Sequence, residues 1–439
     1  MTDLSALREL LSIPSISADP KRGRDVRAAL DWVVAFIRDA GGDAELLAGT
    51  SGELVVGELR ASSNRERAPT VLIYGHVDVQ PPDPLDLWDS PPFEPALRDG
   101  WLYCRGVADD KGQFWLLLEA ARRLAAKREL PVNVRILCDA EEEIGGLSAA
   151  HWVEEDPHGA DACVIFDTAM LGRRIPVFNL ACRGTAYFHL VVRTGRRDAH
   201  SGVFGGAGLN ALHAMAIALQ AVLPRNGRLP DGLRADALPV DPEEIASWVD
   251  LPRGEDVLGA EGVVPADDEA AREFYIRTWA EPSLDVHGIE GGSAHLMKTI
   301  VPAQAEANLS VRLVPGQTVA GVSASLEELL QDGAPPGALV QLELLSGSEA
   351  ARVSPESPAI QLGIAAFERV VGVAPRLVRT GGSLPLAPAL SRRGIPAVIT
   401  GFDLPEGNIH APNERFLLEN LELGLDCARE LFLAYAGLR

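Results

Sequence analysis

The sequence lacks any apolar run that approaches the roughly 18 residues needed to cross a membrane. Its start, MTDLSALRELLSIPSIS, mixes acidic and basic side chains among the leucines and has no continuous apolar core of the kind found in signal peptides. Cysteine is scarce, with five residues and no CxxC pair, which favours reduced thiols over a disulfide framework. We therefore expect a cytoplasmic protein whose cysteines are small buried side chains.

An excess of positive charge is also absent. Forty lysines and arginines stand against 62 aspartates and glutamates, for a formal net charge of −22. Nucleic acids and anionic membrane surfaces would repel such a protein, so neither is expected as its main partner. A small ligand or a protein partner fits better. The length of 439 residues and the 47% hydrophobic content predict two packed domains.

Helix and strand patterns alternate in the first third of the chain, as in α/β domains. Residues 71–75, 132–138 and 162–166 are short apolar runs rich in β-branched side chains, which predicts buried strands of a mostly parallel sheet. Residues 26–40 and 114–126 carry apolar side chains at helical spacing and predict helices on the faces of this sheet.

The pattern changes near residue 183. Residues 186–195 alternate like a strand with one solvated face, and residues 208–223 predict an amphipathic helix. A stretch rich in proline, glycine and acidic residues, 224–292, predicts an elaborated loop region. After residue 354 the α/β pattern returns and ends in a helix from about 415. The predicted domains are residues 1–182 (catalytic domain, first part), 183–352 (inserted α+β domain) and 353–439 (catalytic domain, second part).

Histidine and carboxylate residues gather in five segments, each interpreted as lying at or near the carboxyl end of a strand, where open α/β sheets bind their ligands. Taken singly, each segment has a structural alternative: a structural histidine, a helix cap, a solvated acidic run or a turn-forming aspartate. The segments are VLIYGHVDVQP (His76, Asp78), CRGVADDKGQ (Asp109, Asp110), CDAEEEIGG (Glu141 to Glu143), VIFDT (Asp167) and GNIHAPNERF (His410).

Together these segments supply two imidazoles, three carboxylates and a further carboxylate that can act as a base. Two Zn²⁺ ions that share one carboxylate would each have three protein ligands and an open position for water. Such a pair, about 3.5–4 Å apart, can hold a bridging hydroxide and polarise a carbonyl. Asp78 is placed to accept the second ring N–H of His76 and so fix its tautomer. The sequence therefore predicts a di-metal amidohydrolase.

The order of the motifs resembles one family in particular. GHVDVQP, CRGVADDKG, EEEIGG, FDT, RTGGSLP and NIHAPNE follow one another from about residue 70 to 416. This set is similar to the family of carnosinases, bacterial dipeptidases, aminoacylase, acetylornithine deacetylase and carboxypeptidase G. The resemblance covers most of the chain and implies a discontinuous catalytic domain with an inserted lid and dimerisation domain.

The resemblance also implies the roles of the clustered residues. The Asp109–Asp110 peptide would be cis, and Glu142 would be the general base, because EEIG aligns with the family's EExG. Spacing alone does not distinguish the consecutive glutamates. The cofactors would be two divalent ions, zinc by preference, although nitrogen and oxygen ligands also accept manganese or cobalt. The implied ligands are His76, Asp109 and Asp167 for one ion, and Asp109, Glu143 and His410 for the other.

In the inserted domain, DAHSGVFGG makes His200 a candidate donor to the oxyanion of the tetrahedral intermediate, reached across the interface of a homodimer. The resemblance also implies that Thr299, Arg312, Gly382 and Ser383 contact the substrate. Arg312 has a planar fork suited to the substrate's C-terminal carboxylate.

The long 224–292 segment resembles the carnosinase and bacterial dipeptidase branch, which implies hydrolysis of dipeptides or small peptides by a metal-bridging hydroxide with a glutamate base. The alternative is an N-acyl amino acid amidohydrolase of the acetylornithine deacetylase or succinyl-diaminopimelate desuccinylase type. A binding protein without catalysis would have lost a ligand or the base, and here every position is filled.

Overall fold

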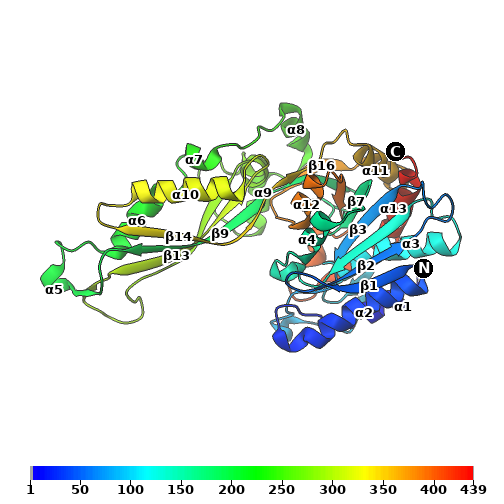
Figure 1. The fold of residues 1–439 in the computed structure, drawn as a ribbon, viewed down its shortest axis with the longest axis horizontal. Coiled ribbons are helices and arrows are strands. Elements are labelled where there is room, and N and C mark those ends of the chain that lie inside the picture. The colour runs from blue at the N-terminus through cyan, green and yellow to red at the C-terminus, as the bar shows by residue number, and fades with distance from the viewer. Residues whose placement is uncertain (1–2, 439) are drawn as a thin grey trace. The chain divides into compact units, whose positions relative to one another are not determined.

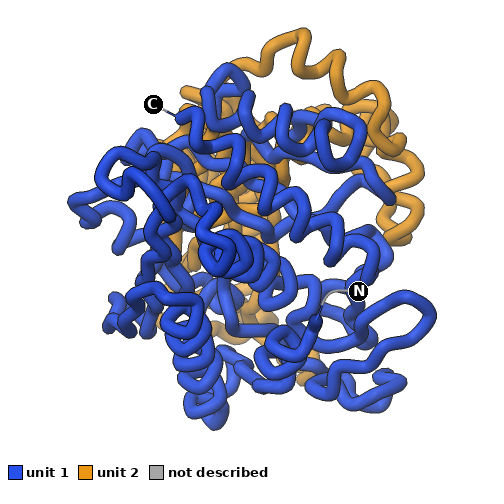
Figure 2. Tube along the Cα trace, turned by 90° about the vertical axis from the view of Figure 1, so that its right-hand side faces the viewer, with its two compact units in different colours: residues 1–180, 353–378, 385–439 blue, residues 181–352, 379–384 orange. Residues whose placement is uncertain are grey.

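The computed structural model describes residues 3–438, which form two compact units (Figure 2). The first unit takes the chain up to residue 180, residues 353–378 and the described residues from 385 onward. The second unit takes residues 181–352 and the short segment 379–384. This segment is far along the chain from the rest of its unit, and it includes Gly382 and Ser383.

The first unit is built on a six-stranded sheet in the order β1-β2-β6-β3-β7-β17 (Figure 1). β6, β3, β7 and β17 are parallel to one another, whereas β2 is antiparallel to both β6 and β1. The mostly parallel α/β sheet predicted from the apolar runs is therefore confirmed. The strands are β1 (Asp43–Ala48), β2 (Glu53–Leu59), β3 (Thr70–His76), β6 (Asn133–Asp139), β7 (Ala162–Phe166) and β17 (Ala397–Thr400).

Helices cover this sheet and close one hydrophobic core. α2 (Gly23–Asp39) packs against β1 and β2, and α13 (Leu418–Tyr435) packs against both α3 (Lys111–Ala126) and α11 (Pro358–Val371). The core is rich in aromatic rings, including those of Phe166, Phe402 and Phe432. The remaining elements of the unit are α1 (Ser5–Leu11), α4 (Ser148–Glu155), α12 (Leu386–Arg392), β4 (Ala96–Arg98), β5 (Trp101–Tyr103) and β18 (Arg415–Leu417).

The second unit is an antiparallel sheet in the order β11-β13-β9-β14, with α6 (Ala211–Gln220) and α10 (Val319–Gly333) packed on it. Its strands are β9 (Gly184–Arg193), β11 (Ser283–Glu290), β13 (Gln304–Leu313) and β14 (Leu339–Ser348). A two-stranded ribbon of β10 (Ala199–His200) and β12 (Ile300–Val301) leads into α5 (Ser201–Phe204). Short strands β8 (Val177–Cys182), β15 (Ala351–Arg352) and β16 (Arg376–Thr380) lie where the chain passes between units.

The prediction that residues 224–292 form a loop region was wrong in part. Strand β11 lies in this stretch and forms an edge of the four-stranded sheet. Leu284 and Val286 alternate with polar residues and face the core, but His287 to Glu290 are exposed, so the strand pattern covers only the first half of β11. The stretch also holds the short helices α7 (Asp231–Arg234), α8 (Pro242–Ser247) and α9 (Gly254–Ala260).

All five cysteines are buried and unbridged, as expected. Within residues 3–438, no helix is both long enough and apolar enough to cross a membrane.

Gly401 sets a close approach between two segments of the first unit. It follows β17, where the amide of Asp167 donates to the Thr400 carbonyl at 3.0 Å. A Cβ atom on Gly401 would lie 1.7 Å from the carbonyl oxygen of Thr168. Any larger residue must therefore push the segment after β17 away from Asp167 and Thr168.

We expect Gly401→Ala to lower the free energy of unfolding by about 1–3 kcal/mol, because overpacking forces backbone shifts. Gly23→Ala is a matched control, since a Cβ there meets nothing within 4 Å. Denaturant titration of both variants would check this. Equal midpoints for the two variants would contradict the steric argument.

Candidate active site

The clustered residues meet at one edge of the six-stranded sheet, where the parallel strands end. His76 is the last residue of β3, and Asp167 directly follows β7. Beyond β6, a short 3-10 turn, η3 (Glu142–Ile144), carries Glu142 and Glu143. Asp109 lies just before α3. The side-chain nitrogen and oxygen atoms of these segments that could bind a metal ion lie close to one another.

Two triads of possible metal ligands share Asp109. Each triad has its ligand atoms within 4.8 Å of one another: His76, Asp109 and Asp167 in one, and Asp109, Glu143 and His410 in the other. Asp109 Oδ1 lies 3.1 Å from His76 Nε2, and Asp109 Oδ2 lies 3.0 Å from His410 Nε2. The two oxygens of one carboxylate therefore face two different imidazoles. The Asp109–Asp110 peptide bond is cis, as the resemblance implied.

The chemistry of this cluster fits a pair of divalent cations. His76 Nε2 and Glu143 Oε1 are buried, and neither has a hydrogen bond of acceptable geometry among the described residues. Burial raises the pKa of the Asp167 carboxyl, and the nearby negative charge of Asp109 raises it further. Contacts with Asp109 and Glu143 raise the pKa of His410 to about 10. A buried group of acids with unpaired ligand atoms requires compensating positive charge.

Neighbouring side chains orient the triads. His76 Nδ1 lies 3.2 Å from Asp78 Oδ1, and both side chains are fully buried, so Nε2 is directed toward Asp109. Gln80 was not singled out from the sequence, yet its Nε2 donates to Glu143 Oε2 at 2.8 Å. The amide of Glu143 also donates to Asp78 Oδ2 at 3.2 Å. The side chain of Gln80 is partly buried, and no sequence signal distinguishes it from an ordinary residue that follows a strand.

The three consecutive glutamates have different environments. Glu141 Oε1 accepts hydrogen bonds from Ser51 Oγ and from the Ser148 amide, both at 2.8 Å, so this side chain fastens loops together. Glu143 belongs to the second triad. Glu142 makes no hydrogen bond through its side chain within the described part of the chain, and burial raises its pKa. Of the three, Glu142 is the carboxylate that remains available to exchange a proton.

Glu414 is a buried carboxylate that holds the loop carrying Asp109. Its Oε2 accepts from Arg105 Nη1 at 2.7 Å and from the Gly106 amide at 2.9 Å. Its Oε1 accepts from the Ala108 amide at 2.9 Å and the Asp109 amide at 3.3 Å. The carboxylate of Glu414 therefore accepts four hydrogen bonds from residues 105–109, the loop that ends at Asp109.

Asn413 and Glu414, although they stand in the loop before the final helix as capping residues would, do not cap it. The strand β18 (Arg415–Leu417) comes between them and α13, because residues 415–417 pair with β5. Asn413 Oδ1 instead accepts from the Asp89 amide at 2.9 Å. The partners of Glu414 lie about three hundred positions earlier in the chain, so local sequence patterns could not reveal them.

The candidate substrate residues of the second unit fall into two groups. His200 pairs with Ile300 in the ribbon, and the Ser201 amide donates to the Thr299 carbonyl at 2.9 Å. Near the opposite end of β13, Arg312 Nη1 lies 3.3 Å from Ser383 Oγ. β13 has 10 residues, which corresponds to about 30 Å between the groups. His200 and Thr299 are therefore adjacent, whereas Arg312 and Ser383 form a separate group in the same unit.

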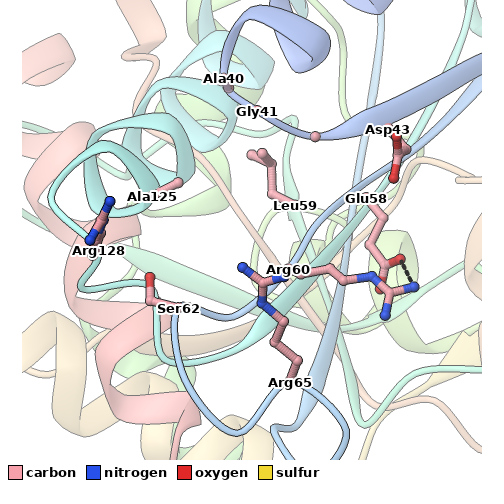
Figure 3. A pocket seen from close by; sticks show the side chains of 11 residues that line it. Ala40, Gly41, Asp43, Glu58, Leu59, Arg60, Ser62, Arg65, Ala125 and Arg128 are labelled. Carbon is pink, nitrogen blue, oxygen red and sulfur yellow. Dashed lines mark ion pairs between the residues drawn. The ribbon is translucent and has the colours of Figure 1, made fainter.

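A pocket elsewhere in the first unit lacks this chemistry (Figure 3). It lies beside the end of β2. Because β2 is antiparallel to β6, this is where the parallel strands begin, at the opposite end of the strands from His76. Arg60, Arg65 and Arg128 line it, and Arg60 is paired with Glu58 at 3.2 Å. No histidine lines this pocket.

Comparisons with known proteins agree with the two triads of possible metal ligands, because the relatives include metallopeptidases. Residues 72–434 match the model of the family described as "Peptidase family M20/M25/M40". The Cys-Gly metallodipeptidase dug1 of Schizosaccharomyces pombe is 30% identical over 465 residues, covering 98% of this chain and 94% of that protein. The human Beta-Ala-His dipeptidase is 28% identical over 390 residues, covering 84% and 75%.

Among solved structures, the M20 family metallo-carboxypeptidase Sso-CP2 from Sulfolobus solfataricus is similar with a TM-score of 0.85 and 26% identity. The similarity covers 99% of this chain and 100% of that one. The fold, the paired triads and these relatives define the class as metallopeptidases. The chain belongs to peptidase family M20/M25/M40, which confirms the family inferred from the motifs.

We expect Glu414→Gln to weaken metal binding by roughly 10- to 100-fold, as changes to groups that hold metal ligands typically do. An amide cannot accept from all four donors, since its NH₂ group would face backbone N–H groups. Metal content after dialysis against a graded chelator would measure this. Glu406→Gln is the control, because Glu406 is an exposed acid near His410 in the sequence. Equal metal retention by both variants would contradict the role given to Glu414.

Proposed function

We propose that this protein is a di-metal dipeptidase that hydrolyses the amide bond of dipeptides or small peptides. The observation that carries the proposal is the carboxylate of Asp109, whose two oxygens face the imidazoles of two triads. The relatives support the substrate class, since their names describe dipeptidases for Cys-Gly and Beta-Ala-His.

In this proposal, His76, Asp109 and Asp167 hold one ion, and Asp109, Glu143 and His410 hold the other. The mixed nitrogen and oxygen ligands suit zinc, and manganese or cobalt are the alternatives. When bound, such ions acidify water and stabilise negative charge that develops on a carbonyl oxygen.

The chain's own residues supply the proton transfers. Glu142 takes a proton from the attacking water and delivers it to the leaving amine. Its raised pKa supports this role, because a carboxylate titrating closer to neutral pH accepts and returns a proton more readily. Asp78 keeps the ring of His76 in a single tautomer, with Nε2 free for a metal ion.

The second unit recognises the substrate in this proposal, as a lid and dimerisation domain. Arg312 binds the C-terminal carboxylate, and Gly382 and Ser383 complete that pocket. Within residues 3–438 Arg312 forms no ion pair, which leaves its charge available to a ligand. His200 and Thr299 lie about 30 Å from Arg312 along β13, so they would act on a substrate held by the other subunit of a dimer.

Glu142→Gln should retain its metal ions but lose about 100- to 10,000-fold in kcat, because it removes the general base without removing a ligand. Asp109→Ala should lose metal as well as activity, because both triads depend on it. Elemental analysis together with steady-state kinetics would check both expectations. A Glu142→Gln enzyme that keeps wild-type kcat would refute the assignment of the base.

A panel of dipeptides and of N-acetyl and N-succinyl amino acids would test the substrate class after loading with zinc or manganese. We expect turnover of dipeptides with free amino groups and little or none of the acylated amino acids. Turnover confined to the acylated compounds would reject the peptidase function in favour of an amidohydrolase of N-acyl amino acids.

We expect a homodimer formed through the second unit. Val203 and Phe204 lie next to His200 and are 69% and 53% exposed, which suits an interface with a second copy. Light scattering at assay concentration would measure the mass, and His200→Ala should lower kcat by about 100-fold or more if it stabilises the oxyanion. A fully active monomer would overturn this expectation.

A further inference from the structure

An ion pair joins the 224–292 segment to the loop that carries Gly382 and Ser383. Glu244 lies in α8 of that segment, and its carboxylate accepts from Arg379 at both oxygens: Nε to Oε1 at 2.5 Å and Nη2 to Oε2 at 2.8 Å. The side chain of Arg379 is only 3% exposed and that of Glu244 is 19% exposed. In Figure 1, α8 lies close to β16, the strand that contains Arg379. A bidentate, largely buried pair of this kind is geometrically specific.

Arg379 is the first residue of the 379–384 segment, which contains Gly382 and Ser383. The same segment is held from another side by Arg183. The Arg183 amide donates to the Gly382 carbonyl at 3.2 Å, and Arg183 Nε donates to the Gly381 carbonyl at 3.1 Å. Two independent anchors, one through Arg379 and one through Arg183, therefore define the path of this loop.

The loop ends at the group proposed to bind the substrate. Ser383 Oγ accepts from Arg312 Nη1 at 3.3 Å. Arg183 lies close enough to Arg312 for their charges to repel, and burial together with this repulsion lowers the pKa of Arg183 to about 10. Asp285 attracts Arg183 electrostatically, but among residues 3–438 no carboxylate lies within ion-pair distance of Arg183 or Arg312. Two neighbouring guanidinium groups with no directly paired carboxylate form a site that favours an anion.

We propose that Glu244 is a positioning residue for carboxylate recognition: through Arg379 it orders residues 380–383, so that Ser383 and Arg312 together receive the terminal carboxylate of the substrate. This inference rests on the proposed dipeptidase function. It also assigns a purpose to α8, because the 224–292 segment then supplies the outer anchor of the substrate loop. The competing interpretation is that the Glu244–Arg379 pair only stabilises the second unit.

Glu244→Gln tests the proposal, with Glu243→Gln as the matched control. Glu243 is the adjacent residue of α8, is exposed, and undergoes the same chemical change. The substrates are a dipeptide and the same dipeptide with a C-terminal amide, which lacks the carboxylate. Glu244→Gln should raise KM for the dipeptide by about tenfold with kcat unchanged within about twofold, while KM for the amide stays the same. Glu243→Gln should change neither.

A second measurement does not depend on activity. Amide hydrogen exchange of a peptide covering residues 379–384 should be about tenfold faster in Glu244→Gln than in the wild type or in Glu243→Gln, because the outer anchor is lost. If Glu244→Gln fails to fold because Arg379 is left buried without a partner, the double variant Glu244→Leu with Arg379→Leu removes both charges. The double variant should fold and show the same KM rise and faster exchange.

The outcomes separate the two ideas. A wild-type enzyme that hydrolyses no dipeptide overturns the proposed function, and the exchange measurement then decides alone whether Glu244 orders the loop. An active dipeptidase in which Glu244→Gln leaves the exchange unchanged, or alters KM equally for the acid and the amide, overturns the positioning role. A KM rise confined to the free acid together with faster exchange supports it.

Discussion

The site depends on one carboxylate, that of Asp109, which two imidazoles approach from different sides. Such an arrangement is costly by itself, because several acids lie together in a region from which water is largely excluded. Hydrogen bonds from several neighbouring residues hold Asp109 and its loop in place despite this cost. Glu414 and Arg105 shape the loop before Asp109, and Asp110 Oδ2 accepts from the backbone amide of His76 at 3.2 Å. Asp109 and His76 are therefore fixed by neighbours that lie outside the two triads.

Parallel strands explain why much of the site could be predicted. Residues such as His76 and Asp167 follow apolar runs, and the carboxyl ends of parallel strands share one edge of the sheet, so local patterns placed these side chains together. The division of these residues into two triads was implied by the resemblance of the motifs to the family. The environment of Glu141 could not be predicted, because it depends on Ser51 and on Ser148, the first residue of α4. Neighbouring glutamates that look equivalent in the sequence thus have different contacts in the folded protein.

The partners missed by the sequence share a physical property. Gln80, which is partly buried, and Glu414, which is buried, form polar contacts with segments remote in the chain. Neither residue alters the hydrophobic pattern on which secondary-structure prediction relies. The edge strand β11 was missed because its polar and apolar residues alternate only in its first half and its second half is exposed, although its backbone pairs with β13. The hydrophobic pattern of a sequence gives little information on two kinds of interaction: backbone hydrogen bonds at a sheet edge, and polar contacts between distant segments.

Charge distribution bears on how a substrate would be recognised. A chain with a formal net charge of −22 repels anionic ligands at long range, so its overall field does not assist the approach of a carboxylate. At physiological ionic strength this repulsion is screened beyond about 8 Å, and only nearby groups decide affinity. Arg312 and Arg183 are such groups, because they are partly buried and have fixed hydrogen-bond partners in Ser383 and Ser283. Under the proposed function, selection of a terminal carboxylate comes from the geometry of these donors, and hence from the order of the loop that carries Ser383.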